Sequence, residues 1–273
     1  MNSKDFFTLT NGVKIPAIGF GTWQIPLGDA AYNSVTAALK SGYRHIDTAL
    51  AYGNESSVGQ AIRDSGIDRS EIFVTSKLPA EIKNYALALR YADKTIKNIG
   101  LDYIDLYLIH APWPWGEMGA DYTKQNIQIW KAMEKFYEKG STRSIGISNF
   151  NVSDINAILE TCRIRPMVDQ IKFHIGHQQQ EIREHCSKNE ILVEGYSPLA
   201  TGNLLHNTSI EGVAKKYGKS VAQLSVRYVL QKGAVPLPKS THPEFIRQNI
   251  DVDFEITEED MKFLDGLKGT SRD

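Results

Sequence analysis

The stretch Ser41-Gly-Tyr-Arg-His-Ile-Asp-Thr-Ala-Leu-Ala-Tyr-Gly-Asn-Glu55 contains the residues of a strand, a polar loop and the start of a helix. Residues 44–47 have the pattern of a short buried strand, and Asn54 with Glu55 is typical of a helix start. Asp47 ends the expected strand, and Tyr52 lies in the loop above it. The stretch therefore predicts one strand–helix unit with a carboxylate and a phenol as candidate site residues.

The same alternation of apolar run and helical pattern recurs along the rest of the chain. Strand starts follow one another at about 30 residues, the length of a βα unit. The eight expected strands are residues 16–20, 44–47, 72–75, 104–109, 144–147, 167–171, 191–194 and 234–237. This pattern predicts a single (β/α)8 TIM barrel over residues 1–273, with a doubly wound open sheet as the alternative. The barrel is favoured because polar or aromatic residues follow every strand, as expected where eight strand ends share one mouth.

A β-hairpin is expected ahead of the barrel. Residues 7–15 alternate around Asn11-Gly12, which is the preferred pair for a tight two-residue hairpin turn. Further along, Asn84 is expected to cap a helix that Gly100 ends, and residues 220–223 have the spacing of a capping box.

Composition excludes several classes of protein. In 273 residues, 41% are hydrophobic and 23% are charged, which is typical of a globular chain. The net charge of −1 and the lack of a Lys/Arg stripe argue against a nucleic-acid partner. No apolar run is long enough to cross a membrane, and the N-terminus does not resemble a signal peptide. Cys162 and Cys186 form no disulfide framework, so we expect a cytoplasmic protein with reduced thiols.

Four side chains near the ends of the second, third and fourth expected strands form a candidate catalytic set: Asp47, Tyr52, Lys77 and His110. Each alone has an ordinary structural explanation, but a barrel would bring all four to one mouth. An ammonium lowers the pKa of a neighbouring phenol, which titrates near ~10 when free, and a buried ammonium needs a carboxylate partner. Lys77 is thus expected to tune Tyr52, and Asp47 to keep Lys77 charged. With His110 as a donor, the set fits the protonation of a carbonyl oxygen during hydride addition.

Several blocks give the chain a family resemblance. They are Gly42–Ala49 with Tyr52 and Asn54-Glu55, Val74–Leu78, Asp105–His110, Gly146–Phe150, Tyr196–Leu199 and Pro238–Ser240. In these blocks, which cover nearly the whole chain in order, the sequence resembles the aldo-keto reductases. The resemblance implies a monomeric reductase of aldehydes or ketones, with Tyr52 as general acid, Lys77 and Asp47 as its tuning pair and His110 as the group that orients the substrate.

Hydride chemistry requires a carrier, so a nicotinamide cofactor is expected. Residues 19–24 lack the third glycine of the Rossmann fingerprint. Instead, residues 238–244 end the last strand and start a helix, with Ser240 or Thr241 as the expected cap and Pro243 in the first turn. Backbone N–H groups at that terminus and the Lys239 charge predict an anion site.

The resemblance assigns the cofactor contacts, and it implies NADP. Lys239 and Ser240 would hold the 2′-phosphate, and Ser148, Asn149 and Gln170 would hold the carboxamide. Tyr196 would stack on the nicotinamide ring, Ser197 and Leu199 would approach the pyrophosphate, and Asn249 would face the adenine. Gly21, Thr22 and Trp23 are the remaining expected cofactor contacts. Phe245 stands where many members of the family carry an arginine that supports the 2′-phosphate. NADPH is therefore expected over NADH, with NAD as the alternative.

Tryptophans in the loops after the first and fourth strands are candidates for the substrate pocket. Trp23, Ala111 and Trp113 are the expected lining residues, and Trp115 is a further candidate. Ala111 departs from the family, in which a tryptophan commonly follows the histidine. No metal site is expected, because His174, His177 and His185, with Cys186, match no zinc spacing. Two other functions stay open: a non-enzymatic nicotinamide-binding subunit, and a barrel enzyme that acts on phosphorylated sugars.

Overall fold

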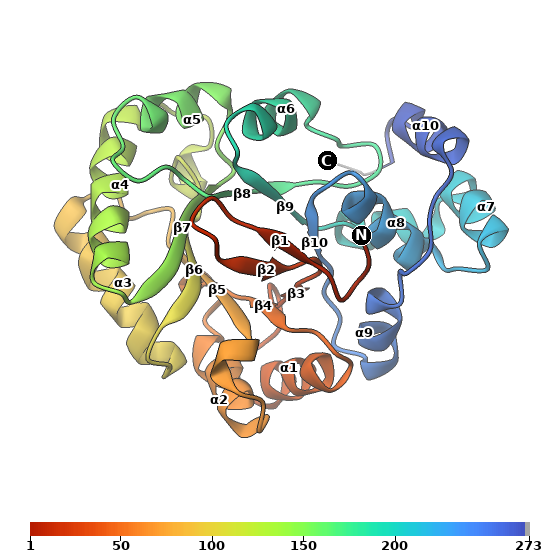
Figure 1. Ribbon diagram of the computed structural model, residues 1–273, viewed down its shortest axis with the longest axis horizontal. Helices are drawn as coiled ribbons and strands as arrows, with labels where there is room; N and C mark the ends of the chain where they lie inside the picture. Colours follow the sequence, from red (N-terminus) through yellow and green to blue (C-terminus); the bar gives the residue numbers. More distant parts are fainter. Residues whose placement is uncertain (271–273) are drawn as a thin grey trace.

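Eight parallel strands form a barrel that is surrounded by helices (Figure 1). The computed structural model describes residues 1–270. The barrel strands are β3 Phe20–Gly21, β4 His45–Asp47, β5 Phe73–Leu78, β6 Ile104–Ile109, β7 Thr142–Ser148, β8 Val168–Lys172, β9 Leu192–Tyr196 and β10 Val235–Leu237. They are adjacent in chain order. The predicted barrel is confirmed.

Backbone hydrogen bonds join the first and last strands. The N–H group of Gly19 donates to the carbonyl of Pro236, and that of Gly21 donates to the carbonyl of Pro238, each at 3.0 Å. The first barrel strand is shorter than expected, because Pro16 belongs to the hairpin before it. The third is longer than expected, because β5 continues past Thr75 and contains Lys77.

The hairpin crosses one end of the barrel (Figure 1). It pairs β1 Phe6–Thr8 with β2 Lys14–Pro16. The predicted two-residue turn is wrong: Leu9 donates to the carbonyl of Val13, so residues 10–12 form a three-residue loop in which Gly12 has a φ of 83°. Such a loop ends with a residue in the left-handed region, a position that favours glycine. Asn11 and Gly12 therefore lie in the turn, as predicted, but the loop has one residue more than expected.

The hairpin fills the end of the barrel that it crosses. Its buried Leu9 and Ile15 form a cluster with Leu106, Leu108 and Val168 from the barrel interior. The side chains that alternate with these along each strand point outward, and Tyr107 of β6, for example, packs against Phe136 in the surrounding helix layer. The opposite, C-terminal end of the barrel is where strand ends present polar side chains.

The helices cover the outside of the barrel. They are α1 Asp29–Lys40, α2 Glu55–Asp64, α3 Tyr85–Ile99, α4 Thr123–Glu138, α5 Val152–Leu159, α6 Gln180–Lys188, α7 Thr208–Lys216, α8 Val221–Gln231, α9 Pro243–Ile250 and α10 Glu258–Gly266. Short 3-10 helices are η1 Leu50–Tyr52, η2 Arg69–Glu71, η3 Trp115–Glu117 and η4 Ala200–His206. Within residues 1–270, no helix combines the length and apolar character needed to cross a membrane.

The expected helix signals are present. The Asn84 side chain accepts from the N–H of Leu87 at the start of α3, and Gly100 ends that helix in the left-handed conformation. Ser220 and Gln223 form the reciprocal bonds of a capping box at the start of α8. These local bonds satisfy backbone groups that a helix end leaves free, which explains why sequence alone locates them.

Candidate active site

Asp47, Lys77 and Tyr52 meet at the C-terminal end of the barrel. Asp47 ends β4, Lys77 lies in the neighbouring β5, and Tyr52 ends η1. The Lys77 Nζ donates to both carboxylate oxygens of Asp47 at 2.7 Å, and it lies 3.4 Å from the Tyr52 hydroxyl. The ammonium and the carboxylate are almost fully buried. The predicted triad is thus assembled, with Lys77 beneath the phenol and Asp47 beside it.

Asn54 fixes the loop that carries Tyr52. Its side-chain oxygen accepts from the Thr48 hydroxyl, and its amide N–H groups donate to the carbonyls of Thr22 and Ile25, each within 2.9 Å. The loops after β3 and β4 are therefore joined through one buried amide. This is the local reason why the phenol keeps its place above the strand ends.

Burial and charge act in opposite directions on the two proton-carrying groups. Burial alone would lower the pKa of Lys77, but the Asp47 carboxylate more than compensates, and the pKa lies above its ordinary value. Burial raises the pKa of Tyr52, and the Lys77 ammonium offsets only part of that rise. The expectation that Lys77 brings the Tyr52 pKa below that of a free phenol is therefore wrong, because burial outweighs the nearby charge.

His110 follows β6 and faces the phenol. Its ring centroid lies 5.5 Å from that of Tyr52. Burial, and secondarily the Lys77 charge, lowers the pKa of His110 to about 3, so the imidazole is neutral at pH 7. A neutral imidazole has one N–H donor, which suits it to orient an oxygen rather than to supply charge.

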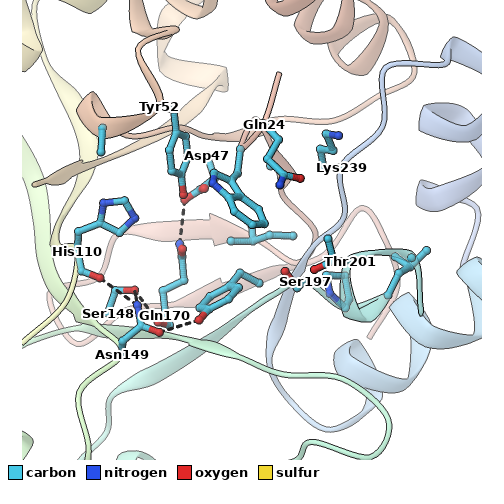
Figure 2. A pocket seen from close by; sticks show the side chains of 18 of the residues that line it. Gln24, Asp47, Tyr52, His110, Ser148, Asn149, Gln170, Ser197, Thr201 and Lys239 are labelled. Atoms are coloured by element: carbon cyan, nitrogen blue, oxygen red, sulfur yellow. Dashed lines mark hydrogen bonds between the residues drawn. The ribbon is translucent and has the colours of Figure 1, made fainter. Parts of the chain in front are cut away.

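A cavity of about 720 Å³ opens above these residues. Figure 2 shows Tyr52, Asp47 and His110 at one side of it and Lys239 across from them. The lining residues are Gly21, Trp23, Gln24, Asp47, Ala51, Tyr52, His110, Trp115, Ser148, Asn149, Gln170, Tyr196, Ser197, Pro198, Leu199, Thr201, Gly202, Leu205, Leu237 and Lys239. They lie at or just after the C-terminal ends of the barrel strands other than β5, because strand ends converge on one mouth in such a barrel.

Amide and hydroxyl groups line the floor of the cavity beside His110. Asn149 donates to the His110 carbonyl at 3.0 Å and accepts from the Tyr196 hydroxyl at 2.8 Å. The Ser148 hydroxyl donates to the Gln170 carbonyl at 2.7 Å. Figure 2 shows this network below Tyr52. It fixes the amide groups at the end of β7 and β8 in one arrangement.

Gln170 also connects the floor to two carboxyl groups. Its amide nitrogen donates to Asp47 and to Glu194, at 2.8 Å each. Glu194 is fully buried, and burial together with the Asp47 charge raises its pKa to about 8. Because both N–H groups of the Gln170 side-chain amide are used, only its side-chain oxygen remains to accept a further hydrogen bond.

The far end of the cavity is marked by Lys239, which is exposed after β10. The expected cap of the next helix is wrong: α9 has His242 as its N-cap, without a side-chain cap bond. The Ser240 hydroxyl instead accepts from the N–H of His242. Pro243 occupies the first turn as expected, because a helix start needs no N–H there.

Comparison with known proteins matches residues 17–268 to the aldo/keto reductase family. The chain belongs to this family. It is 43% identical to the glyoxal reductase of Bacillus subtilis over 98% of the chain and 95% of that protein. It is 39% identical to an aldehyde reductase of Saccharomyces cerevisiae over 99% of the chain and 94% of that protein. The crystal structure of an aldo-keto reductase from a deep-sea metagenome superposes with a TM-score of 0.91 at 41% identity, over 98% of this chain and 96% of the other.

Most of the residues predicted for the site line the cavity of this aldo/keto reductase, and some lie behind it. Lys77 and Thr22 are buried beneath the floor, where the Thr22 hydroxyl donates to the Asp47 carbonyl at 2.9 Å. Asn249 is also buried, on α9, and Ser240 lies outside the lining. Ala111 is fully buried, and Trp113 packs edge-to-face on Trp115 rather than on the cavity.

The structure adds lining residues that sequence reasoning missed. Gln24, Ala51, Thr201, Gly202 and Leu205 line the cavity of the reductase together with Trp115. One signal was present for the 200–202 segment: Ala-Thr-Gly directly follows the Tyr196–Leu199 block after β9. Ala200, Thr201 and Gly202 all have a positive φ, which gives the segment a sharp bend over the cavity. Among residues 1–270, no three His, Cys, Asp or Glu side chains are grouped closely enough for a metal ion.

Proposed function

We propose that this chain reduces aldehydes or ketones to alcohols with NADPH as the hydride donor. The observation that carries the proposal is the Tyr52 hydroxyl, which faces the cavity and lies 3.4 Å from the Lys77 ammonium. A phenol held beside an ammonium whose charge a buried carboxylate stabilises is suited to act as a general acid for an oxygen that gains negative charge. The names of the glyoxal and aldehyde reductases to which the chain is similar support the same reaction class.

The residues around the cavity fit a nicotinamide dinucleotide. The cavity volume of about 720 Å³ is in the range of cofactor sites. Asn149 and the free Gln170 oxygen would hold the carboxamide with Ser148, and the Tyr196 ring would pack on the nicotinamide. Ser197 and Leu199 would lie along the pyrophosphate with Gly21, Thr22 and Trp23 nearby. When bound, the cofactor supplies a hydride to the carbonyl carbon.

The side chains of the barrel would manage the proton. The neutral His110 imidazole would donate a hydrogen bond to the substrate oxygen and orient it toward Tyr52. The Tyr52 hydroxyl would pass its proton to that oxygen as charge develops there. The Lys77 ammonium stabilises the phenolate left behind, and Asp47 keeps Lys77 protonated. The rise in the Tyr52 pKa caused by burial keeps the hydroxyl protonated until that step.

Preference for NADPH over NADH is part of the proposal. Lys239 lines the far end of the cavity and carries its positive charge. With Ser240 it would hold the 2′-phosphate, and Asn249 would lie toward the adenine side. Phe245, where related proteins often have arginine, would make this preference weaker than in those proteins.

The experiment is a steady-state assay of NADPH oxidation with a panel of aldehydes, ketoses and dicarbonyls. We expect turnover with the wild type, and Tyr52→Phe should lower kcat by roughly 10²- to 10⁴-fold. NADPH binding, measured by nucleotide fluorescence, should stay unchanged in this variant. If Tyr52→Phe retains wild-type turnover, the mechanism is wrong. NADPH binding by the wild type without turnover of any carbonyl would instead support an accessory, non-enzymatic role.

A further inference from the structure

The segment after β6 brings an indole to the carbonyl site. The Trp115 ring lies edge-to-face on the His110 imidazole, with 5.4 Å between the centroids, and it lines the cavity. Trp113 in turn packs edge-to-face on Trp115 at 5.3 Å. Trp115 is 40% exposed, so one part of the ring rests on protein while another is open to a ligand. The wall beside the predicted substrate-orienting histidine is therefore aromatic.

Two polar side chains fix the path of this segment. The Lys83 ammonium donates to the carbonyl of Ala111 at 2.9 Å and to the side-chain oxygen of Asn126 at 3.1 Å. The amide nitrogen of Asn126 donates to the carbonyl of Pro112 at 2.8 Å. Two successive carbonyls between His110 and the tryptophans are thus each held by a side chain from another part of the chain.

These bonds lie in a poorly hydrated environment. Asn126 is buried, and burial lowers the pKa of Lys83 to about 8, against the opposing influence of Glu81 and Asp154. The Lys83 ammonium also lies 5.6 Å from the centre of the Tyr122 ring. A buried carbonyl that loses its donor carries a desolvation penalty, so removal of Lys83 should release the backbone at Ala111.

The charges around the cavity limit the class of substrate. Among the described lining residues, Lys239 has the only cationic side chain, and Figure 2 shows it across the cavity from Tyr52 and His110. A carboxylate or phosphate on the substrate would find no cation beside the reacting carbonyl except Lys77, which is already paired with Asp47. Tyr52, Trp115 and Trp23 offer aromatic surface instead. This surface suits an uncharged substrate with a planar apolar group.

We propose that Trp115 is a specificity-determining residue for uncharged aldehydes with an aromatic substituent, and that Lys83 and Asn126 are positioning residues that hold it against His110. The inference rests on the proposed carbonyl reduction. It assigns no chemical step to Lys83 or Asn126. It requires that loss of either one change the choice of substrate rather than the chemistry itself.

The test compares kcat/KM for benzaldehyde and for propanal, with NADPH as the cofactor. Trp115→Ala should lower the benzaldehyde-to-propanal ratio about fivefold to tenfold, mainly through KM. Lys83→Met should lower the same ratio, and Lys83→Arg, which retains a charged donor, should restore most of it. Lys97→Met, which removes an exposed lysine of the adjoining helix α3, is the matched control and should leave the ratio unchanged.

A double variant separates positioning from a general structural effect. In the Trp115→Ala background, Lys83→Met should cause no further change in the ratio, because the residue through which it acts is gone. If Lys83→Met does not fold, as judged by circular dichroism and NADPH binding, Asn126→Asp serves in its place, because its carboxylate can still accept from Lys83 but cannot donate to the Pro112 carbonyl, which the added negative charge repels. An equal loss for both aldehydes, or an additive effect in the double variant, overturns the inference alone. No turnover of either aldehyde by the wild type overturns the proposed function and the inference with it.

Discussion

The Lys77 ammonium lies 2.7 Å from both oxygens of the Asp47 carboxylate, and both side chains are almost fully buried between β4 and β5. An exposed pair in the same protein, Lys139 and Asp93, has the same 2.7 Å separation with each side chain about 60% exposed. Distance alone therefore does not distinguish the two pairs. Burial does, because a buried ion that loses its partner cannot turn to water.

Asp47→Asn should destabilise the protein and slow its chemistry. It leaves the buried Lys77 charge without a counter-ion, and such a loss costs about 3–5 kcal/mol of unfolding free energy. It should also lower the rate of the chemical step in single-turnover experiments, because without Asp47 the pKa of the buried Lys77 falls and a smaller fraction of it carries the charge that stabilises the phenolate of Tyr52. NADPH affinity should change little, since the side-chain oxygen of the substituted asparagine can still accept the hydrogen bond from Gln170. Urea unfolding and stopped-flow NADPH oxidation measure the two effects.

The exposed pair provides the control. Asp93→Asn should change the unfolding free energy by less than about 1 kcal/mol, because solvent screens an exposed ion pair. The double variant Asp47→Asn/Lys77→Met should recover part of the stability lost in Asp47→Asn, since it removes the stranded charge. If Asp47→Asn and Asp93→Asn have equal effects, the buried pair does not have the role given to it here.

His110 should act as a neutral group at every pH at which the enzyme is assayed. Burial, with help from the Lys77 charge, lowers the pKa of His110 to about 3, so the imidazole does not titrate between pH 5 and 8. The profile of kcat/KM against pH should therefore lack a step due to this residue near pH 6.5. His110→Asn should lower kcat/KM at all these pH values without changing the shape of the profile. A wild-type step near pH 6.5 that is absent from His110→Asn would contradict the neutral assignment.

Strand ends and family blocks were sufficient to predict the barrel and to predict which side chains meet at its C-terminal end. Asp47, Lys77 and Tyr52 are separated by 25 to 30 residues or by one short loop, so the regular βα repeat fixes where they meet. The capping residues of α3 and α8 were predictable for a similar reason, because each bonds to an N–H three residues away. Features determined by the local sequence or by the repeat itself could be predicted.

Features that depend on distant bonds could not be predicted. Trp115 rather than Trp113 lines the cavity because Lys83 and Asn126 hold the preceding carbonyls, and those contacts span 28 and 14 residues. The pKa direction at Tyr52 was also missed, because it depends on how deeply the folded chain buries the ring. Spacing in the sequence identifies neighbours but does not measure burial.

The buried Glu194 carboxyl should make stability depend on pH. Burial and the Asp47 charge raise its pKa to about 8 in the folded protein, against about 4.5 when unfolded. Between these values the folded state keeps a proton that the unfolded state releases. The contribution is therefore complete below pH 4.5 and is lost as the pH rises through 8. Urea unfolding at pH 6 and pH 9 should show a fall of a few kcal/mol at the higher pH.

Glu194→Gln isolates this effect. The variant keeps an oxygen that can accept from Gln170 but cannot ionise, so its stability should fall much less between pH 6 and pH 9. Glu181→Gln, at an exposed position in α6, should behave like the wild type. His45 lies 3.6 Å from Glu194, and burial lowers its pKa to about 3, so it stays neutral throughout this range. Identical slopes in wild type and Glu194→Gln would refute the role of this carboxyl.

Cofactor preference should be controlled by Lys239 and Phe245. Lys239 carries the positive charge at the far end of the cavity. Lys239→Ala should therefore raise the KM for NADPH roughly tenfold to hundredfold, which corresponds to the loss of one hydrogen bond to a charged group. NADH, which has no 2′-phosphate, should be affected far less.

Phe245 lies in the first turn of α9, where the residue is 46% exposed and its ring centroid lies 5.5 Å from that of His242. Phe245→Arg would add a bidentate phosphate donor at this helix start, and it should raise kcat/KM for NADPH relative to NADH. Arg247→Ala is the control, because Arg247 projects about 200° around the helix from Phe245 and should leave the ratio nearly unchanged. Steady-state kinetics with both cofactors measure all three variants. A clear NADH advantage in the wild type, or equal losses with both cofactors in Lys239→Ala, would show that the charge at Lys239 does not select the 2′-phosphate.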